Sequence, residues 1–98
     1  MTILPKNRAY LRGLGAKIKP SLNLGKNEID ESFIAAFDNA LKAHELVKIK
    51  VLQNNGEDLE KIADEIVEAT DSGLVGIIGK TILFYRPNKK DPKIILPR

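Results

Sequence analysis

Two apolar runs near the end of the chain are separated by only two residues. Residues 74–78 (LVGII) and 81–86 (TILFYR) are rich in β-branched and aromatic side chains, which are typical of strands. Between them, Gly79-Lys80 places glycine at the first central position of a two-residue turn, which suits a type II′ β-hairpin. The two runs are therefore predicted to be antiparallel neighbours, and the fold of this chain must contain a sheet built on them.

The same segment contains Gly79-Lys80-Thr81 and so raises the question of a nucleotide-phosphate loop. Such a loop needs an earlier glycine, at the position that Leu74 occupies here, and a helix opening directly after the threonine. A strand pattern follows Thr81 instead. We therefore interpret the segment as two core strands whose side chains alternate between the faces of the sheet. Leu83 and Tyr85 are expected on one face, and Ile82, Phe84 and Arg86 on the other.

The beginning of the chain has a helical pattern. Asn7 is expected to cap a helix that runs to about Ile18, because Pro20 cannot continue it. Gly13 and Gly15 each weaken this helix by about 1 kcal/mol relative to alanine, so it must be held by packing. Its outer face is expected to carry Arg8, Arg12 and Lys19.

Strand and helix patterns alternate through the middle of the chain. Two strands are expected at residues 21–24 and 46–52, and two helices at about 31–44 and 58–70. Asp30 is placed to cap the first of these helices, and Gly73 lies near the C-terminal cap of the second. The strand at 46–52 is expected to bury one face, because its apolar residues alternate with Lys48 and Lys50. The order α-β-α-β-α-β-β predicts a single α/β domain spanning residues 1–98, with helices packed on a mixed four-stranded sheet.

Catalytic and metal chemistry have little support in the residue types. The chain has no cysteine, which excludes disulfides, zinc knuckles and thiol catalysis. His44 is the single histidine, and carboxylates on the helix at 58–70 have no histidine beside them, so they are interpreted as a solvated face. We expect no enzyme activity, no cofactor and no metal. The absence of a long apolar run or a signal peptide predicts a soluble cytoplasmic protein, expected to be a monomer.

The net charge of +3 is unevenly distributed along the sequence. Residues 1–27 contain no acid, and every acidic residue except Asp91 lies between positions 28 and 79. Basic residues return from Lys80 onward and continue into a Lys/Pro-rich tail at about 88–98. A chain with basic ends and an acidic middle can present one positive face, which is the electrostatic footprint of a polyanionic partner.

Several segments together resemble a known family. They are Arg8–Pro20 (RAYLRGLGAKIKP), Leu24-Gly25-Lys26, His44–Lys50 (HELVKIK), and Ile78–Thr81 (IGKT) followed by Leu83–Pro87 (LFYRP). In this order they resemble the bacterial YhbY family of stand-alone CRM (chloroplast RNA splicing and ribosome maturation) domains. The resemblance covers roughly residues 6–98 and implies a fold like the C-terminal domain of translation initiation factor 3.

The resemblance further implies an RNA-binding, non-catalytic ribosome-assembly factor that binds rRNA of the large-subunit precursor. Family members carry a KH-like Gly-x-x-Gly loop after the first strand, where glycines let the backbone approach phosphates. Here the loop is residues 25–28, and Glu28 replaces the second glycine with a carboxylate that repels phosphate. The residues expected to contact RNA are Arg8, Arg12, Lys17, Lys19, Gly25, Lys26, Asn27, Lys80 and Arg86.

Two questions about partners stay open from the sequence alone. The few aromatic residues argue against a stacking platform, although Tyr10 or Tyr85 could contribute one base contact. The alternative to RNA binding is a protein–protein adaptor that docks on ribosomal proteins through its acidic third helix.

Overall fold

The helices and strands follow one another in the order expected from the sequence. The computed structural model describes residues 3–25, 29–52 and 58–90, together with 92, 94 and 96. The helices in these residues are α1 (Pro5–Gly15), α2 (Glu31–His44) and α3 (Leu59–Thr70). The strands are β1 (Leu22–Leu24), β2 (Leu46–Val51), β3 (Gly73–Ile78) and β4 (Thr81–Tyr85).

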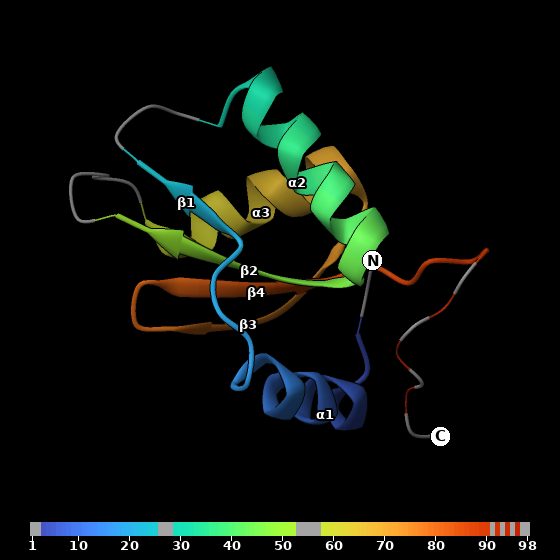
Figure 1. The fold of residues 1–98 in the computed structure, drawn as a ribbon. Helices are drawn as coiled ribbons and strands as arrows, with labels where there is room; N and C mark the ends of the chain where they lie inside the picture. Colours follow the sequence, from blue (N-terminus) through green and yellow to red (C-terminus); the bar gives the residue numbers. More distant parts are fainter. Residues whose placement is uncertain are drawn as a thin grey trace.

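The four strands form one mixed sheet with the order β1-β2-β4-β3. β1 pairs with β2 in parallel, and α2 provides the crossover between them, whereas β4 is antiparallel to both β2 and β3. α2 and α3 lie on one face of the sheet and α1 lies on the other (Figure 1). The predicted α/β architecture, with helices on a mixed four-stranded sheet, is confirmed.

β4 lies in the interior of the sheet and is buried on both faces. Ile82 and Phe84 face α2 and α3, where the Phe84 ring meets the Phe37 ring edge-on with centroids 5.1 Å apart. Leu83 and Tyr85 face α1. Their partners in this second cluster include Leu11, Leu46 and Val75. The predicted alternation along this strand is confirmed, and each large side chain buried in this way contributes about 1.5–3 kcal/mol.

The turn between β3 and β4 has the expected geometry. Gly79 has a φ of +59°, while Lys80 does not share the positive φ, which is the pattern of a type II′ turn. β4 begins at Thr81, so a strand follows the Gly-Lys-Thr sequence where a phosphate loop requires a helix. The interpretation of this segment as a structural hairpin is therefore confirmed.

Three local predictions require correction. The N-cap position of α1 is occupied by Leu4, not Asn7, and Leu4 makes no side-chain capping bond. Pro5 fits the first helical position because its φ is already fixed. The helix ends at Gly15 rather than near Ile18, and two further turn-type bonds follow it. The left-handed residue after α3 is Asp71, with a φ of 54°, whereas Gly73 is the first residue of β3.

β2 is also more buried than its alternating pattern suggested. The apolar side chains of Val47, Ile49 and Val51 face the α2 and α3 cluster as expected. On the opposite face, however, Leu46 is buried in the α1 cluster and Lys48 is half-buried. The single-buried-face prediction was wrong because α1, which is distant in sequence, covers the second face.

A buried carboxylate ties the end of the described chain to the domain. Glu45 directly follows α2, has a φ of 64° and is fully buried. Its carboxylate accepts hydrogen bonds from the backbone N–H groups of Asn88, at 2.6 Å, and Ile94, at 2.7 Å. Burial raises the pKa of the Tyr85 hydroxyl, and the charge of Glu45 raises that pKa further. The sequence pattern did not indicate this role for Glu45.

The two glycines of α1 are expected to respond oppositely to replacement by alanine. A Cβ at Gly15 would lie 2.3 Å from the Leu83 Cδ2, inside a packed core, whereas a Cβ at Gly13 would meet nothing within 4 Å. We expect Gly15→Ala to destabilise the protein by about 1–3 kcal/mol. Gly13→Ala should stabilise it by about 0.5–1 kcal/mol. Urea unfolding of both variants checks this, and equal shifts of the same sign would contradict the packing.

Candidate nucleic-acid interface

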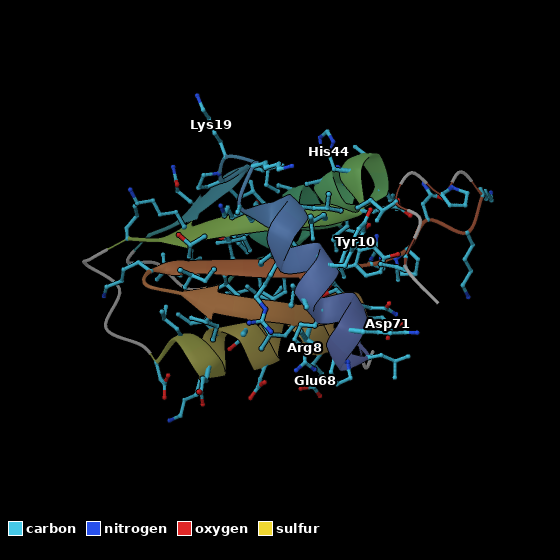
Figure 2. The ribbon with its side chains drawn as sticks, turned by 90° about the horizontal axis from the view of Figure 1, so that it is seen from below. Arg8, Tyr10, Lys19, His44, Glu68 and Asp71 are labelled. Carbon is cyan, nitrogen blue, oxygen red and sulfur yellow. The ribbon has the colours of Figure 1, made fainter. Side chains whose placement is uncertain are left out.

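Acidic side chains are confined to one layer of this domain, whereas basic side chains occur in both layers. In the described residues, Asp and Glu occur only in α2, α3 and the residues flanking these two helices. α1, the four strands and the hairpin turn contain no acid, and their cations lie in α1, in β2 and at Lys80 of the turn. Figure 2 views the side of the sheet that α1 covers, with α1 in front. Lys19 extends outward near β1, and Glu68 of α3 lies at the opposite side of the view. The sheet and α1 therefore form a basic layer.

Lys48 attaches the basic helix α1 to the sheet. Its Nζ donates to the backbone oxygen of Gly15 at 2.9 Å and to that of Ile18 at 3.1 Å. These carbonyls lie at or just beyond the end of α1, where backbone acceptors are unsatisfied and the helix dipole is negative. A lysine on an interior strand must find such partners when a helix covers it. Its position in the middle of β2 is the only sequence signal for this role.

Arg12 extends over the sheet from the outer side of α1. A Cβ built at Gly76 would lie 3.4 Å from the Arg12 Cδ, so the glycine leaves room for the arginine stem on β3. Arg12, Lys48, Gly76 and Ile78 line a shared small hollow. The basic groups of α1 and β2 thus meet at the part of the sheet that α1 leaves uncovered.

Lys50 and Lys80 extend this basic surface toward the hairpin turn. Lys50 is exposed and lies two residues after Lys48, hence on the same face of β2. Its partner across the ladder is Thr81, which in turn is paired with Ile78. Ile78 is 63% exposed, which is unusual for so apolar a residue beside so many cations. Lys50 was not among the residues predicted from the sequence, because it was counted only as part of an alternating strand.

The predicted Gly-x-x-Gly loop starts at the same end of the sheet. The backbone N–H of Leu52 donates to Leu24 at 2.9 Å, and that of Val51 donates to Lys80 at 2.7 Å. Gly25, which follows Leu24, is therefore close in the structure to the end of β2 and to the hairpin turn. The loop residues Lys26, Asn27 and Glu28 lie outside the described residues.

The remaining predicted residues divide into two groups. Lys17 and Lys19 are exposed in the segment after α1 and continue the basic surface. Arg8 lies one helical turn before Arg12 on α1, and its Nη2 donates to the Ile3 oxygen at 3.1 Å. Of the two tyrosines proposed for base contact, Tyr10 is 43% exposed and Tyr85 only 2%, so Tyr85 is a core residue.

Arg86 is engaged on the opposite face of the sheet. Its Nη1 lies 2.7 Å from the Asp38 Oδ1 and donates to the Thr70 oxygen at 2.8 Å. It thereby connects α2 to the C-terminal end of α3. The hydrogen bond from Arg86 lowers the pKa of Asp38 below its ordinary value of 3.8, and Lys42 acts in the same direction.

The described residues present no metal-binding cluster. No group of three or more His, Asp or Glu side chains in this part of the chain could hold a metal ion. No helix found there is both long and apolar enough to cross a membrane. The basic layer presents several cations beside backbone turns. Such a surface can bind a ligand that carries repeated negative charge.

Comparison with known proteins places the chain among close relatives. Residues 3–86 match the family model of the CRS1 / YhbY (CRM) domain. The chain is 36% identical to the probable RNA-binding protein YqeI of Bacillus subtilis over 92 residues, covering 94% of this chain and 96% of the relative. It is 37% identical to an RNA-binding protein of Haemophilus influenzae over 97 residues, covering 99% and 97% of the two chains.

A solved structure is similar over the same extent. The solution structure of the hypothetical protein SAV1595 from Staphylococcus aureus, described as a candidate RNA-binding protein, superposes with a TM-score of 0.82 at 41% sequence identity. The match covers 97% of this chain and 99% of the other. The two proteins are therefore similar in both fold and sequence over nearly their whole lengths.

Lys48→Met is expected to destabilise the protein by about 2 kcal/mol, because it leaves the Gly15 and Ile18 carbonyls without their charged donor. Lys50→Met is the matched control, since it makes the same change at an exposed position on the same face. The control should change the free energy of unfolding by less than about 0.5 kcal/mol. Urea unfolding measures both, and similar values for the two variants would show that Lys48 does not hold α1.

The Asp38–Arg86 pair is expected to make stability depend on pH. Because the pKa of Asp38 is lower in the folded protein, its contribution is present above about pH 4 and is lost as the pH falls further. Asp38→Asn should therefore cost about 1 kcal/mol at pH 6 and much less at pH 3. Asp64→Asn, an exposed aspartate without a described ion pair, is the control. A pH-independent cost for Asp38→Asn would refute the linkage.

Proposed function

The chain belongs to the CRS1 / YhbY (CRM) domain family, and on this premise we propose that it is an RNA-binding protein. The relatives named above as RNA-binding proteins align with it over almost their entire length. The observation that carries the proposal furthest is the acid-free layer formed by α1 and the sheet. On it, Lys50 and Lys80 lie close to the start of the Gly25 loop, and Arg12 lies beside Lys48 and Ile78.

Recognition in this proposal is mainly of the RNA backbone. Arg12, Lys50 and Lys80 neutralise phosphates, and Lys17 and Lys19 extend the contact beyond α1. Gly25 allows a close approach of the loop backbone, with Lys26 and Asn27 contributing from the loop itself. Only Tyr10 among the described aromatic residues is placed for stacking on a base. Shape and phosphate spacing therefore contribute more to affinity than base identity.

Arg8 and Arg86 have a smaller part in this proposal than the sequence suggested. The Arg86 guanidinium is held by Asp38 and Thr70, and that of Arg8 lies toward the β3 edge beside Ile3. Both strengthen the positive potential of the domain, but each guanidinium is already hydrogen-bonded within the domain. Their replacement would act first on stability.

The finer proposal is that the RNA is rRNA of the large ribosomal subunit precursor and that the protein assists its assembly without catalysing a reaction, in the cytoplasm. This step is supported by the family resemblance. Crosslinking in cells, followed by mapping of the crosslinked nucleotides, tests it directly. Crosslinks confined to messenger or transfer RNA would contradict the rRNA assignment while leaving RNA binding intact.

Charge reversal on the basic layer is expected to weaken RNA binding irrespective of RNA sequence. Arg12→Glu, Lys50→Glu and Lys26→Glu should each lower affinity about tenfold near 0.1 M salt and reduce the slope of log affinity against log salt. Lys61→Glu makes the same change of charge on the exposed side of α3 and serves as the control. Filter binding to rRNA fragments measures all four. Equal affinities across the series, with no salt slope, would refute the proposal.

A further inference from the structure

β3 is an edge strand without the usual protection against pairing. It has β4 on one side, and in the described part of the chain no hydrogen bond joins its other side to another segment. Edge strands are commonly protected by lysine or proline, yet Gly73–Ile78 contains no charged residue and no proline. Its single irregularity is a bulge between Leu74 and Gly76. Half of its backbone N–H and C=O groups therefore remain open to a further strand.

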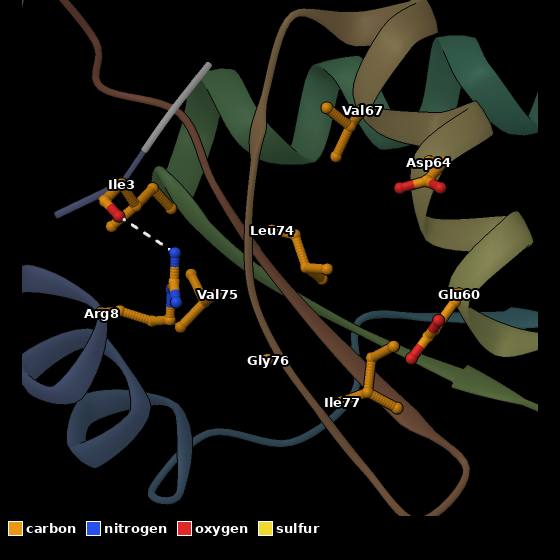
Figure 3. A pocket seen from close by; sticks show the side chains of 9 residues that line it. All are labelled: Ile3, Arg8, Glu60, Asp64, Val67, Leu74, Val75, Gly76 and Ile77. Atoms are coloured by element: carbon orange, nitrogen blue, oxygen red, sulfur yellow. Dashed lines mark hydrogen bonds between the residues drawn. The ribbon is translucent and has the colours of Figure 1, made fainter. Parts of the chain in front are cut away.

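A groove of about 600 Å³ runs along this edge between α1 and α3 (Figure 3). Ile3 and Arg8 form one wall, and Glu60 and Asp64 of α3 form the other. The floor consists of apolar or small residues from β3 and α3. These floor residues are Val67, Leu74, Val75, Gly76 and Ile77.

The charges of the groove favour a particular ligand. Glu60 and Asp64 are exposed and have no ion pair among the described residues. Their carboxylates repel the phosphates of RNA and attract lysine or arginine side chains. On the opposite wall, the Arg8 Nε is buried and has no hydrogen-bond partner in the described structure. Because this atom is enclosed by the protein, the ligand preference of the groove rests on Glu60 and Asp64.

We propose that β3 accepts an extended, basic peptide segment of a partner protein as an additional strand. The backbone of the peptide pairs with the open edge of β3, which provides affinity that does not depend on the peptide sequence. Alternate side chains then face opposite sides of the extended sheet, so lysine or arginine residues on one side reach Glu60 and Asp64.

This site meets the proposed RNA surface at Gly76, which lines both the groove and the hollow beside Arg12. RNA contacts the exposed side of α1 and the hairpin end, whereas the peptide lies along the outer edge of β3. The two ligands also differ in charge, so each surface excludes the other's ligand. The domain can therefore hold RNA and a basic protein segment together, and either site can fail experimentally without the other.

Nuclear magnetic resonance titration with two synthetic peptides tests the proposal. The first is a capped octapeptide in which lysine alternates with valine, and the second replaces each lysine by glutamate. The lysine peptide should shift the amide signals of Gly73–Ile78, slow their exchange with solvent and bind at least about tenfold more tightly than the glutamate peptide. Failure of the lysine peptide to bind, or shifts confined to Arg12, Lys50 and Lys80, would overturn the proposal.

Matched charge variants locate the acidic contact on α3. Glu60→Lys/Asp64→Lys should weaken the lysine peptide about tenfold or more, whereas Glu31→Lys/Glu65→Lys, the same change away from the groove, should alter affinity less than about threefold. The milder pair Glu60→Gln/Asp64→Asn covers the case in which lysine near the start of α3 unfolds the helix. Equal losses for the groove pair and the control pair would overturn the proposal. So would an RNA oligonucleotide that shifts the β3 amides as the lysine peptide does.

Discussion

Burial of β4 on both faces is the constraint on which the rest of this structure depends. Ile82 and Phe84 require cover on one side of the sheet, and Leu83 and Tyr85 require it on the other. α2 and α3 supply the first cover. The second comes mainly from α1, with Ile3, Ile94 and Leu96 beside it. α1 is short, contains two glycines and has little intrinsic helical stability. The domain therefore depends on contacts that hold a weak helix in place, above all Lys48 and the close packing of Gly15 on Leu83.

The parts of the fold that could be predicted are those determined by local sequence. The Gly79-Lys80 turn, the alternation along β4 and the Asp30 cap, whose side chain accepts a bond from the Phe33 N–H, depend on neighbouring residues. The roles of Lys48 and Glu45 depend on segments that are distant in sequence. Lys48 reaches carbonyls 33 and 30 residues away, and Glu45 binds groups 43 and 49 residues away. No periodicity indicates such contacts.

As with the fold, the sequence predicted those features of the candidate site that depend on local composition. The acid-free beginning of the chain predicted that α1 would be basic, and the structure places Arg12 on its exposed side. That Lys50 and Lys80 share this surface follows from strand pairing, which composition cannot reveal. In the same way, Arg86 looked like a free cation in the sequence. Its partner Asp38 lies 48 residues away on α2, so the ion pair could not be anticipated from the sequence.

β1 has only three residues, and all of its ladder partners belong to β2. The parallel β1–β2 pairing forms only once the α2 crossover is in place, whereas the β3–β4 hairpin closes across a two-residue turn. The sheet should thus assemble from the hairpin outward, with β1 last to join and first to open. Gly25 and its loop follow that strand directly. In the proposed RNA complex, the phosphate contacts of Gly25 would therefore be attached to the least persistent edge of the sheet, and a bound RNA would slow the opening of β1 more than that of any other strand.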